Sequence, residues 1–248
     1  MNGNKSLRLY VEYSVESTEQ RLSGMNLDFI IPAKARSTRV PNKNWRMFAK
    51  PGQSLVSLTV DKLLSAGAKP ERIFVSCEDL AKKEQVDQMG VQFLHRDASL
   101  CGNYVGLTEW LRAIVVQSGA SGDVAWCQVC DPLFNQYDEC LRSWKRFREI
   151  GHYDSFVVCH PYKGYLMTQE HQPIGWSFGT HHTPSQHLPD FYTMPFTLSI
   201  LTQEAIRRTG YHIGLNPVWF KASNRCIDID TVEDFQIAEL YWKQRFNG

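Results

Sequence analysis

A short segment near the start of the chain combines the side chains that a polyphosphate needs. A mostly apolar run over residues 27–31 stops at Pro32, and the loop that follows carries four cations: Lys34, Arg36, Arg39 and Lys43. Arginine offers a planar fork of donors and lysine a compact charge, and both suit phosphate oxygens. Small and turn-forming residues separate the cations, so the segment is typical of a phosphate-binding loop rather than of a surface helix. A solvated charged loop is the alternative, and the Gly-rich spacing of a P-loop is absent.

Two carboxylates lie close together near the other end of the chain. Asp228 and Asp230 alternate with Ile227 and Ile229, so on an extended segment both carboxylates face the same way. Mg²⁺ prefers oxygen ligands and is usually held by one or two carboxylates together with substrate phosphates. Combined with a cationic phosphate loop, the pair predicts a magnesium site. A strand end with incidental acids is the alternative.

Strand-like and helix-like segments alternate between these two motifs. We expect strands at residues 27–32, 72–76, 91–95, 124–129, 155–159 and 196–201. We expect helices at residues 54–66, 79–89, 107–117 and 137–150, a short one from 203, and a last one at 232–246 that Thr231 and Asp234 would cap. The alternation predicts an α/β fold with a mostly parallel twisted sheet and helices on both faces. Ligands of such sheets bind beyond the carboxyl ends of the strands, where the basic loop lies.

One stretch interrupts this alternation. Residues 160–195 are rich in His, Pro, Gly, Thr and aromatic residues and show no clear period, so they predict a lid, an insertion or an interface. Residues 1–25 precede the first strand, and we interpret them as an appended segment of unknown role. Residues 26–248 then form a single domain that contains the irregular insertion.

The composition narrows the function classes. The net charge is +1, which argues against a broadly basic nucleic-acid surface, and no apolar run approaches the roughly 20 residues of a membrane helix. The first 25 residues lack the pattern of a signal peptide. Seven cysteines, an odd number, are scattered through apparent core elements and favour a reducing cytoplasm. The pair Cys127 and Cys130 ends a strand rather than opening a helix, so we interpret both as buried thiols without redox chemistry.

The basic loop resembles the loop that opens the cytidylyltransferases which activate acidic sugars, the CMP-N-acylneuraminate and CMP-Kdo synthetases. Their consensus runs roughly I-P-A-R-x-x-S-x-R-x-P-x-K. The matching residues are Pro32, Ala33, Ser37, Arg39, Pro41 and Lys43, and Asn44 matches the neuraminate branch. Lys34 replaces the first arginine. Residues 227–239 resemble the closing motif of the same family, approximately D-I-D-T-x-x-D-F-x-x-A-E, and the resemblance spans about residues 27–244.

Weaker matches lie between these motifs. Residues 75–79 resemble the V-S-T-D stretch that lies near the nucleotide, and Arg96 matches the start of R-P-x-x-L-A-x-D. Residues 127–133, with Gln128, resemble Q-P-T-S-P-L or Q-G-D-E-P, and the metal-binding aspartate of the latter falls on Cys130, one place before Asp131. Residues 185–192 resemble S-Q-D-L-P-x-x-Y. The Asn-Gly that follows in the family is replaced here by residues 193–197, Thr-Met-Pro-Phe-Thr.

The resemblance implies a Rossmann-like nucleotidyltransferase with a lid or dimerisation region at 160–195. It would transfer CMP from CTP to a hydroxyl of an acidic sugar such as a nonulosonic or 2-keto sugar acid, release pyrophosphate, use Mg²⁺ and form a homodimer. The implied catalytic residues are Lys34, Arg39 and Lys43, and the implied nucleotide-binding residues are Ala33, Ser37, Asn44, Ser76 and Gln128. Arg96, Gln186 and Tyr192 would bind the acceptor, and Asp228 and Asp230 the metal. Another acidic acceptor, such as a phosphonate, and a catalytically silent relative are the alternatives.

Overall fold

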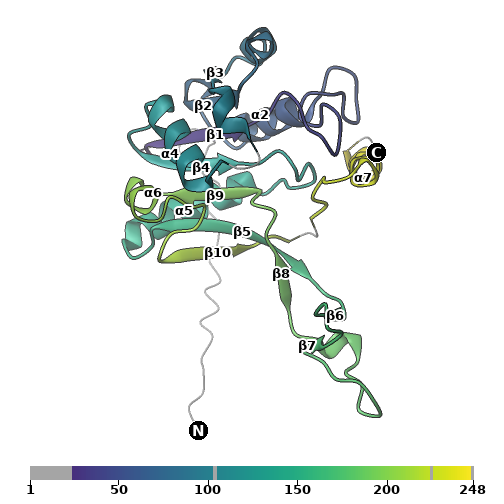
Figure 1. Cartoon of the computed structure of the whole chain (residues 1–248). Coiled ribbons are helices and arrows are strands. Elements are labelled where there is room, and N and C mark those ends of the chain that lie inside the picture. Colours follow the sequence, from purple (N-terminus) through teal and green to yellow (C-terminus); the bar gives the residue numbers. More distant parts are fainter. Residues whose placement is uncertain (1–23, 103–104, 224–225, 247–248) are drawn as a thin grey trace.

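A computed structural model describes residues 24–102, 105–223 and 226–246 of the chain. A twisted sheet forms its centre. The strands run in the order β10-β5-β9-β4-β1-β2-β3, and β8 pairs with the end of β5 (Figure 1). Their bounds are β1 Leu27–Pro32, β2 Ile73–Cys77, β3 Gln92–His95, β4 Asp123–Cys127, β5 Ser155–Tyr162, β8 Phe191–Thr193, β9 Leu198–Leu201 and β10 Pro217–Lys221. The four strands from β4 to β3 are parallel, and β9 is antiparallel to both β4 and β5.

Helices cover both faces of this sheet, because the strands are apolar on both faces. In β1, Phe29 and Ile31 pack into one core with helices α2 and α5, whereas Ile30 packs into a second core with α4 and α6. The helix bounds are α2 Leu55–Ser65, α3 Lys83–Asp87, α4 Leu107–Ser118, α5 Tyr137–Ile150, α6 Gln203–Thr209 and α7 Val232–Phe246. Short 3₁₀ turns lie at Pro70–Arg72, Leu80–Lys82, Ala98–Cys101 and Ser185–His187. The predicted α/β fold is therefore confirmed.

Local hydrogen bonds explain where two of the helices begin. Ser54 and Ser57 form a reciprocal capping box at the start of α2. Before α7, the Thr231 hydroxyl accepts from the Asp234 amide at 3.1 Å, and the Asp234 carboxylate accepts from the Thr231 amide at 2.8 Å, which confirms the predicted cap. Helix α7 then packs against the loop after β1, where the rings of Phe48 and Phe235 meet edge to face at 5.4 Å.

The structure differs from the sequence-based expectation at three places. The helix expected at 79–89 is a 3₁₀ turn, Leu80–Lys82, followed by the short helix α3, and only Val86 of α3 is buried. Strand β10 at the sheet edge was not expected. Strand β5 continues to Tyr162, so it includes the first three residues of the stretch expected to be irregular from 160, and β8 pairs with that extension.

Most of that stretch forms an arm. Between β5 and β8 the chain leaves the sheet and builds a two-stranded ribbon from β6 (Leu166–Met167) and β7 (Pro173–Ile174), well away from the core (Figure 1). Residues 1–23 of the expected appended segment lie outside the described residues. Within the described part of the chain, none of the helices is both long and apolar enough to cross a membrane.

Candidate active site

A cavity of about 750 Å³ opens at the carboxyl ends of the four parallel strands. Its walls include one residue from just beyond each strand: Lys34 after β1, Glu78 after β2, Arg96 after β3 and Gln128 after β4. Parallel strands leave their carboxyl ends at one edge of a sheet, so four loops converge there. The predicted position of the ligand site therefore agrees with the position of the cavity.

Cationic side chains dominate the charge of this cavity. Of the described residues that line it, two are acidic, Glu78 and Asp230, and five are cationic: Lys34, Arg36, Arg39, Lys43 and Arg96. An excess of one sign in a concave, partly enclosed site raises the local concentration of a ligand of the opposite sign. The cavity is consequently suited to a ligand with several negative charges.

Hydrogen bonds hold the basic loop in place. The Ala33 amide donates to the Ser76 carbonyl at 2.9 Å, which extends the pairing of β1 with β2 into the loop. The Lys34 carbonyl accepts from the side chains of Asn44 at 3.0 Å and Trp45 at 3.1 Å. These bonds close the loop over about ten residues, so its cations are positioned before any ligand arrives.

The basic loop also contacts the acidic segment from the other end of the chain. The Lys43 ammonium donates to the Ile229 carbonyl at 2.5 Å, and Arg39 pairs with Asp230 at 2.7 Å. The Ile229 side chain is buried, and its amide donates to the Cys130 carbonyl at 3.0 Å. The two motifs that the sequence singled out therefore meet at one site, although nearly 190 residues separate them.

The second motif supplies two carboxylates beside the cations. Asp230 lines the cavity, and Asp228 lies two residues earlier on the same segment. Partial burial and the neighbouring charge of Asp230 raise the pKa of the Asp228 carboxyl, while Cys130 and Lys43 oppose the rise. A positive charge bound beside Asp228 would lower this pKa again and favour the ionised carboxylate.

Arg96 differs from the other cations because it is fully buried. Its Nη2 lies 3.3 Å from the Glu78 carboxylate, whereas its Nε and Nη1 are buried without a hydrogen-bond partner. Glu78 in turn accepts from the Ala35 amide at 2.9 Å, which connects Arg96 to the basic loop. Buried donors are nearly always hydrogen-bonded in proteins, so two donors without a partner on a residue that lines a cavity suit an anionic or carbonyl ligand.

The remaining predicted site residues have three different positions. Ser37, Asn44 and Gln128 line the cavity, and their nucleotide role stays a prediction. Ala33 and Ser76 are fully buried behind it. Gln186 and Tyr192, the other predicted acceptor contacts, are exposed on the arm and do not line the cavity in this structure.

Several residues of the site carried no predicted role. Glu78 and Trp110 line the cavity beside Arg96, and Cys101 lines it while its carbonyl accepts from the Lys34 ammonium at 2.6 Å. Asp131, to which the resemblance gave only a weak metal role, follows Cys130 directly but does not line the cavity. Its buried carboxylate pairs with His160 at 3.2 Å, and burial raises the pKa of the Asp131 carboxyl. Glu78 could have been found from the sequence, because it is a polar residue directly after an apolar strand.

A sequence model of the family described as Cytidylyltransferase matches residues 29–117. This match covers about a third of the chain, from β1 through α4, and includes the basic loop, Ser76 and Arg96. No curated protein sequence matches the chain.

Solved structures extend the likeness over most of the chain. CMP:2-keto-3-deoxy-manno-octonic acid synthetase complexed with CTP superposes with a TM-score of 0.63 at 11% identity, over 89% of this chain and 100% of that one. A 4-diphosphocytidyl-2C-methyl-D-erythritol synthase from Anaerococcus prevotii DSM 20548 gives 0.54 at 11% identity, over 89% and 100%. A cytidylyltransferase from Leptospira borgpetersenii serovar Hardjo-bovis gives 0.55 at 14%, over 89% and 87%. At these identities the likeness shows the fold, which is the Rossmann-like fold of nucleotidyltransferases.

Proposed function

We propose that this protein is a cytidylyltransferase that transfers CMP from CTP to a hydroxyl of an acidic sugar, of the nonulosonic or 2-keto acid class. The observation that carries the proposal is the cavity at the carboxyl ends of β1 to β4, where five cations face Asp230 and Asp228 lies two residues away. The match to the Cytidylyltransferase family supports the choice of nucleotide, because it covers the residues that supply all five cations.

The residues have distinct roles in this reaction. The acceptor hydroxyl attacks the α-phosphorus of CTP, the bond to the bridging oxygen breaks, pyrophosphate leaves with the electron pair, and the hydroxyl proton is released. Such transfers depend on positioning and charge neutralisation rather than on covalent chemistry by the protein. Lys34, Arg39 and Lys43 would hold the triphosphate and neutralise the charge that develops on the pyrophosphate.

Asp228 and Asp230 would hold Mg²⁺. The donor set fits this ion, because both side chains offer oxygen ligands and Mg²⁺ is usually bound by one or two carboxylates plus substrate phosphates. When bound, Mg²⁺ would supply positive charge at the phosphate oxygens. The chain itself would orient this pair, since Asp230 pairs with Arg39, and Ile229 between the two carboxylates is anchored to Lys43 and Cys130.

An acidic acceptor fits the end of the cavity beside Arg96. The guanidinium group of Arg96 lies there next to Trp110 with two unpartnered donors, so it would donate to oxygen atoms of an anionic acceptor while Trp110 packs against an apolar edge. The predicted contacts on the arm, Gln186 and Tyr192, would reach an acceptor only of a neighbouring subunit or after the arm moves. The protein would then act as a homodimer in the cytoplasm.

One observation favours a different acidic acceptor, such as a phosphonate. Two of the residues that replace the Asn-Gly of the resembling family have contacts elsewhere. The Phe196 ring lies 5.1 Å from the His212 ring, and the Thr197 hydroxyl donates to Asp131 at 3.3 Å. These side chains therefore do not supply the sugar contacts that the family has at this point. A silent relative that only binds nucleotide is the remaining alternative.

The test is pyrophosphate release from CTP and Mg²⁺ with a panel of acidic sugars and phosphonates, with UTP, ATP and GTP as controls. We expect release with CTP and one class of acceptor, and loss of release in Asp228→Asn and Lys43→Ala. Lys69→Ala, an exposed lysine before β2, is the matched control and should keep full activity. CTP binding by calorimetry without release from any acceptor would favour the silent relative. Absence of CTP binding would overturn the proposal.

A further inference from the structure

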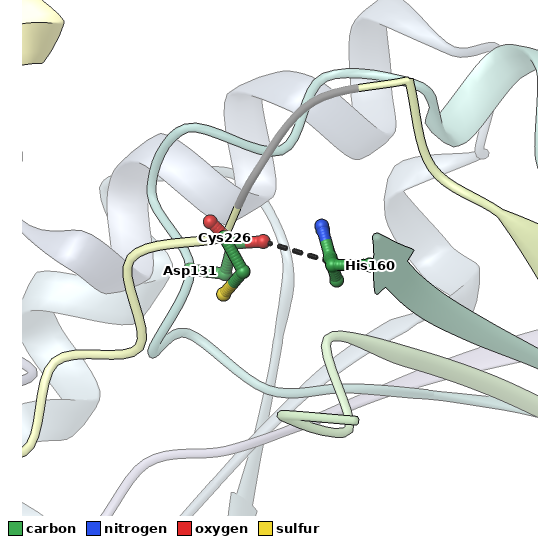
Figure 2. A group of neighbouring side chains, drawn as sticks. All are labelled: Asp131, His160 and Cys226. Atoms are coloured by element: carbon green, nitrogen blue, oxygen red, sulfur yellow. Dashed lines mark ion pairs between the residues drawn. The ribbon is translucent and has the colours of Figure 1, made fainter. Parts of the chain in front are cut away.

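A second group of chemically active side chains lies behind the cavity and has no part in the proposed reaction. Asp131 follows β4, His160 lies near the end of β5, and Cys226 precedes α7, yet their side chains converge (Figure 2). One ligand atom of each residue lies within 4.8 Å of the others, and the Asp131 and His160 atoms are 3.2 Å apart. The group thus joins three segments that are distant in the sequence.

The distances suit a small tetrahedral ion. A zinc ion about 2.0–2.3 Å from each ligand atom holds those atoms about 3.3–3.8 Å apart, so the cluster needs a contraction of about 1 Å at most. Imidazole nitrogen, carboxylate oxygen and thiolate sulfur are all common zinc ligands. Mg²⁺ demands oxygen ligands, so this donor set excludes it as the natural occupant.

The hydrogen bonding of the cluster is incomplete without an ion. Asp131 Oδ2 lies near His160 and the Thr197 hydroxyl, but Oδ1 is buried and has no hydrogen-bond partner among the described residues. The Asp131 and His160 side chains are fully buried, whereas Cys226 is only half-buried. A buried carboxylate oxygen without a partner is costly, and a cation at this position would satisfy it. The partly exposed Cys226 offers the route by which an ion enters.

We propose that Asp131, His160 and Cys226 bind one Zn²⁺ ion that fastens the segment before α7 to the sheet. Binding replaces the S–H bond of Cys226 by a sulfur–zinc bond, and the thiol proton passes to solvent. Water completes the coordination. The ion would be structural: it would fix residues 226–230, and with them Asp228 and Asp230, against β4 and β5. The proposal does not rest on the proposed function, because the cluster lies outside the cavity.

The experiment is a metal titration of the full chain stripped with a chelator, in buffer with excess Mg²⁺ so that any magnesium site is filled. We expect one equivalent of Zn²⁺ to bind and to raise the melting temperature. Co²⁺ should give a thiolate-to-cobalt absorption band. Cys226→Ser should abolish that band and weaken Zn²⁺ binding by more than the ~10-fold that loss of an outer partner typically costs. Asp131→Asn should weaken binding in the same way.

Two variants serve as matched controls. Cys140→Ser removes a buried thiol of α5 outside the cluster, and Asp228→Asn removes a carboxylate of the candidate active site; both should keep the cobalt band. If Cys226→Ser does not fold, alkylation of the wild-type protein replaces it: Cys226 should react in the stripped protein and be protected by Zn²⁺. No bound zinc and no protection, or equal effects of Cys140→Ser and Cys226→Ser, would overturn the proposal.

Discussion

Arg96 buries a guanidinium group of which Nε and Nη1 have no partner, while Nη2 reaches Glu78 across 3.3 Å. Each unsatisfied buried donor costs about 1–3 kcal/mol, and the partly exposed pair with Glu78 returns less than that. Arg96→Met removes these donors but leaves the partly buried Glu78 carboxylate without its partner, so the two effects offset each other. We therefore expect the free energy of unfolding of the unliganded protein to change by no more than about 1 kcal/mol. The same change should abolish ligand binding at the end of the cavity beside Arg96.

Urea unfolding and calorimetric titration with CTP and acceptor test the two halves of this prediction. Arg96→Lys is the comparison, because lysine keeps the charge but loses the planar fork and should restore little binding. A loss of stability of more than 1 kcal/mol in Arg96→Met, with ligand binding intact, would contradict it, because Arg96 would then be a structural residue.

His212 predicts how stability depends on pH. It is buried among aromatic rings, with Trp126 at 5.3 Å, and burial lowers its pKa from 6.5 to about 4. Below pH 6.5 the imidazole of His212 binds a proton in the unfolded chain, whereas in the folded protein it does so only below about pH 4. The free energy of unfolding therefore falls as the pH falls. Between pH 7.5 and 5 this one residue should remove about 2 kcal/mol.

The measurement is urea unfolding at pH 7.5 and pH 5. His212→Phe, which cannot titrate, should lose about 2 kcal/mol less than the wild type over this interval. His181→Phe alters an exposed loop histidine and should leave the wild-type difference unchanged. Equal pH dependence in the wild type and His212→Phe would show that His212 takes up its proton in the folded state.

At the scale of the elements, the segments that the sequence predicted well are those buried on both sides or capped by side chains. Strand β1 is a continuous buried run, and the Thr231–Asp234 cap of α7 was readable from the residue types. Strand β10 was missed because it is a five-residue edge strand on which only Val218 is buried. Sequence periodicity is weak in so short and exposed an element.

The sequence could predict that distant residues meet only where each of the two segments carried a recognisable motif. The basic loop and the Asp228–Asp230 pair were each visible as motifs, so their meeting was expected. The cluster of Asp131, His160 and Cys226 was not, because it depends on β9 running antiparallel between β4 and β5. Neither the strand order nor this reversal leaves a signal in the spacing of the three residues.

The cap of α7 also supports the candidate site, which gives a prediction for this element. The Asp234 carboxylate accepts from the amides of Thr231 at 2.8 Å and Asp230 at 3.1 Å. Asp234→Ala should cost about 1 kcal/mol of stability, the usual loss for such a cap. It should also lower turnover by more than the stability loss explains, because the backbone of Asp230 loses an anchor. Glu233→Ala, one residue earlier and exposed, should change neither quantity.

At the scale of the whole molecule, the cavity and the arm lie on different parts of the sheet. The four parallel strands carry the cavity at their carboxyl ends, whereas β5 and β8 extend beyond the sheet as the base of the arm (Figure 1). The arm exposes large apolar side chains, including Met167 at 49% and Phe178 at 62%. Exposed apolar residues on a projecting element are typical of an interface, and a second copy of the chain is the partner that we propose for it.

This arrangement predicts that the arm can be removed without unfolding the core. Tyr162 and Phe191 are paired neighbours of β5 and β8, so a two-residue Asn-Gly turn can replace residues 163–190 and close a hairpin in the same register. By light scattering, we expect the wild type to be a dimer and the shortened chain a monomer with a melting temperature within a few degrees of the wild type. Phe178→Asp should weaken the dimer, whereas Val116→Asp, a change at an 80% exposed apolar residue of α4, should not. A monomeric wild type, or a shortened chain that still dimerises, would place the interface elsewhere or remove it from the mechanism.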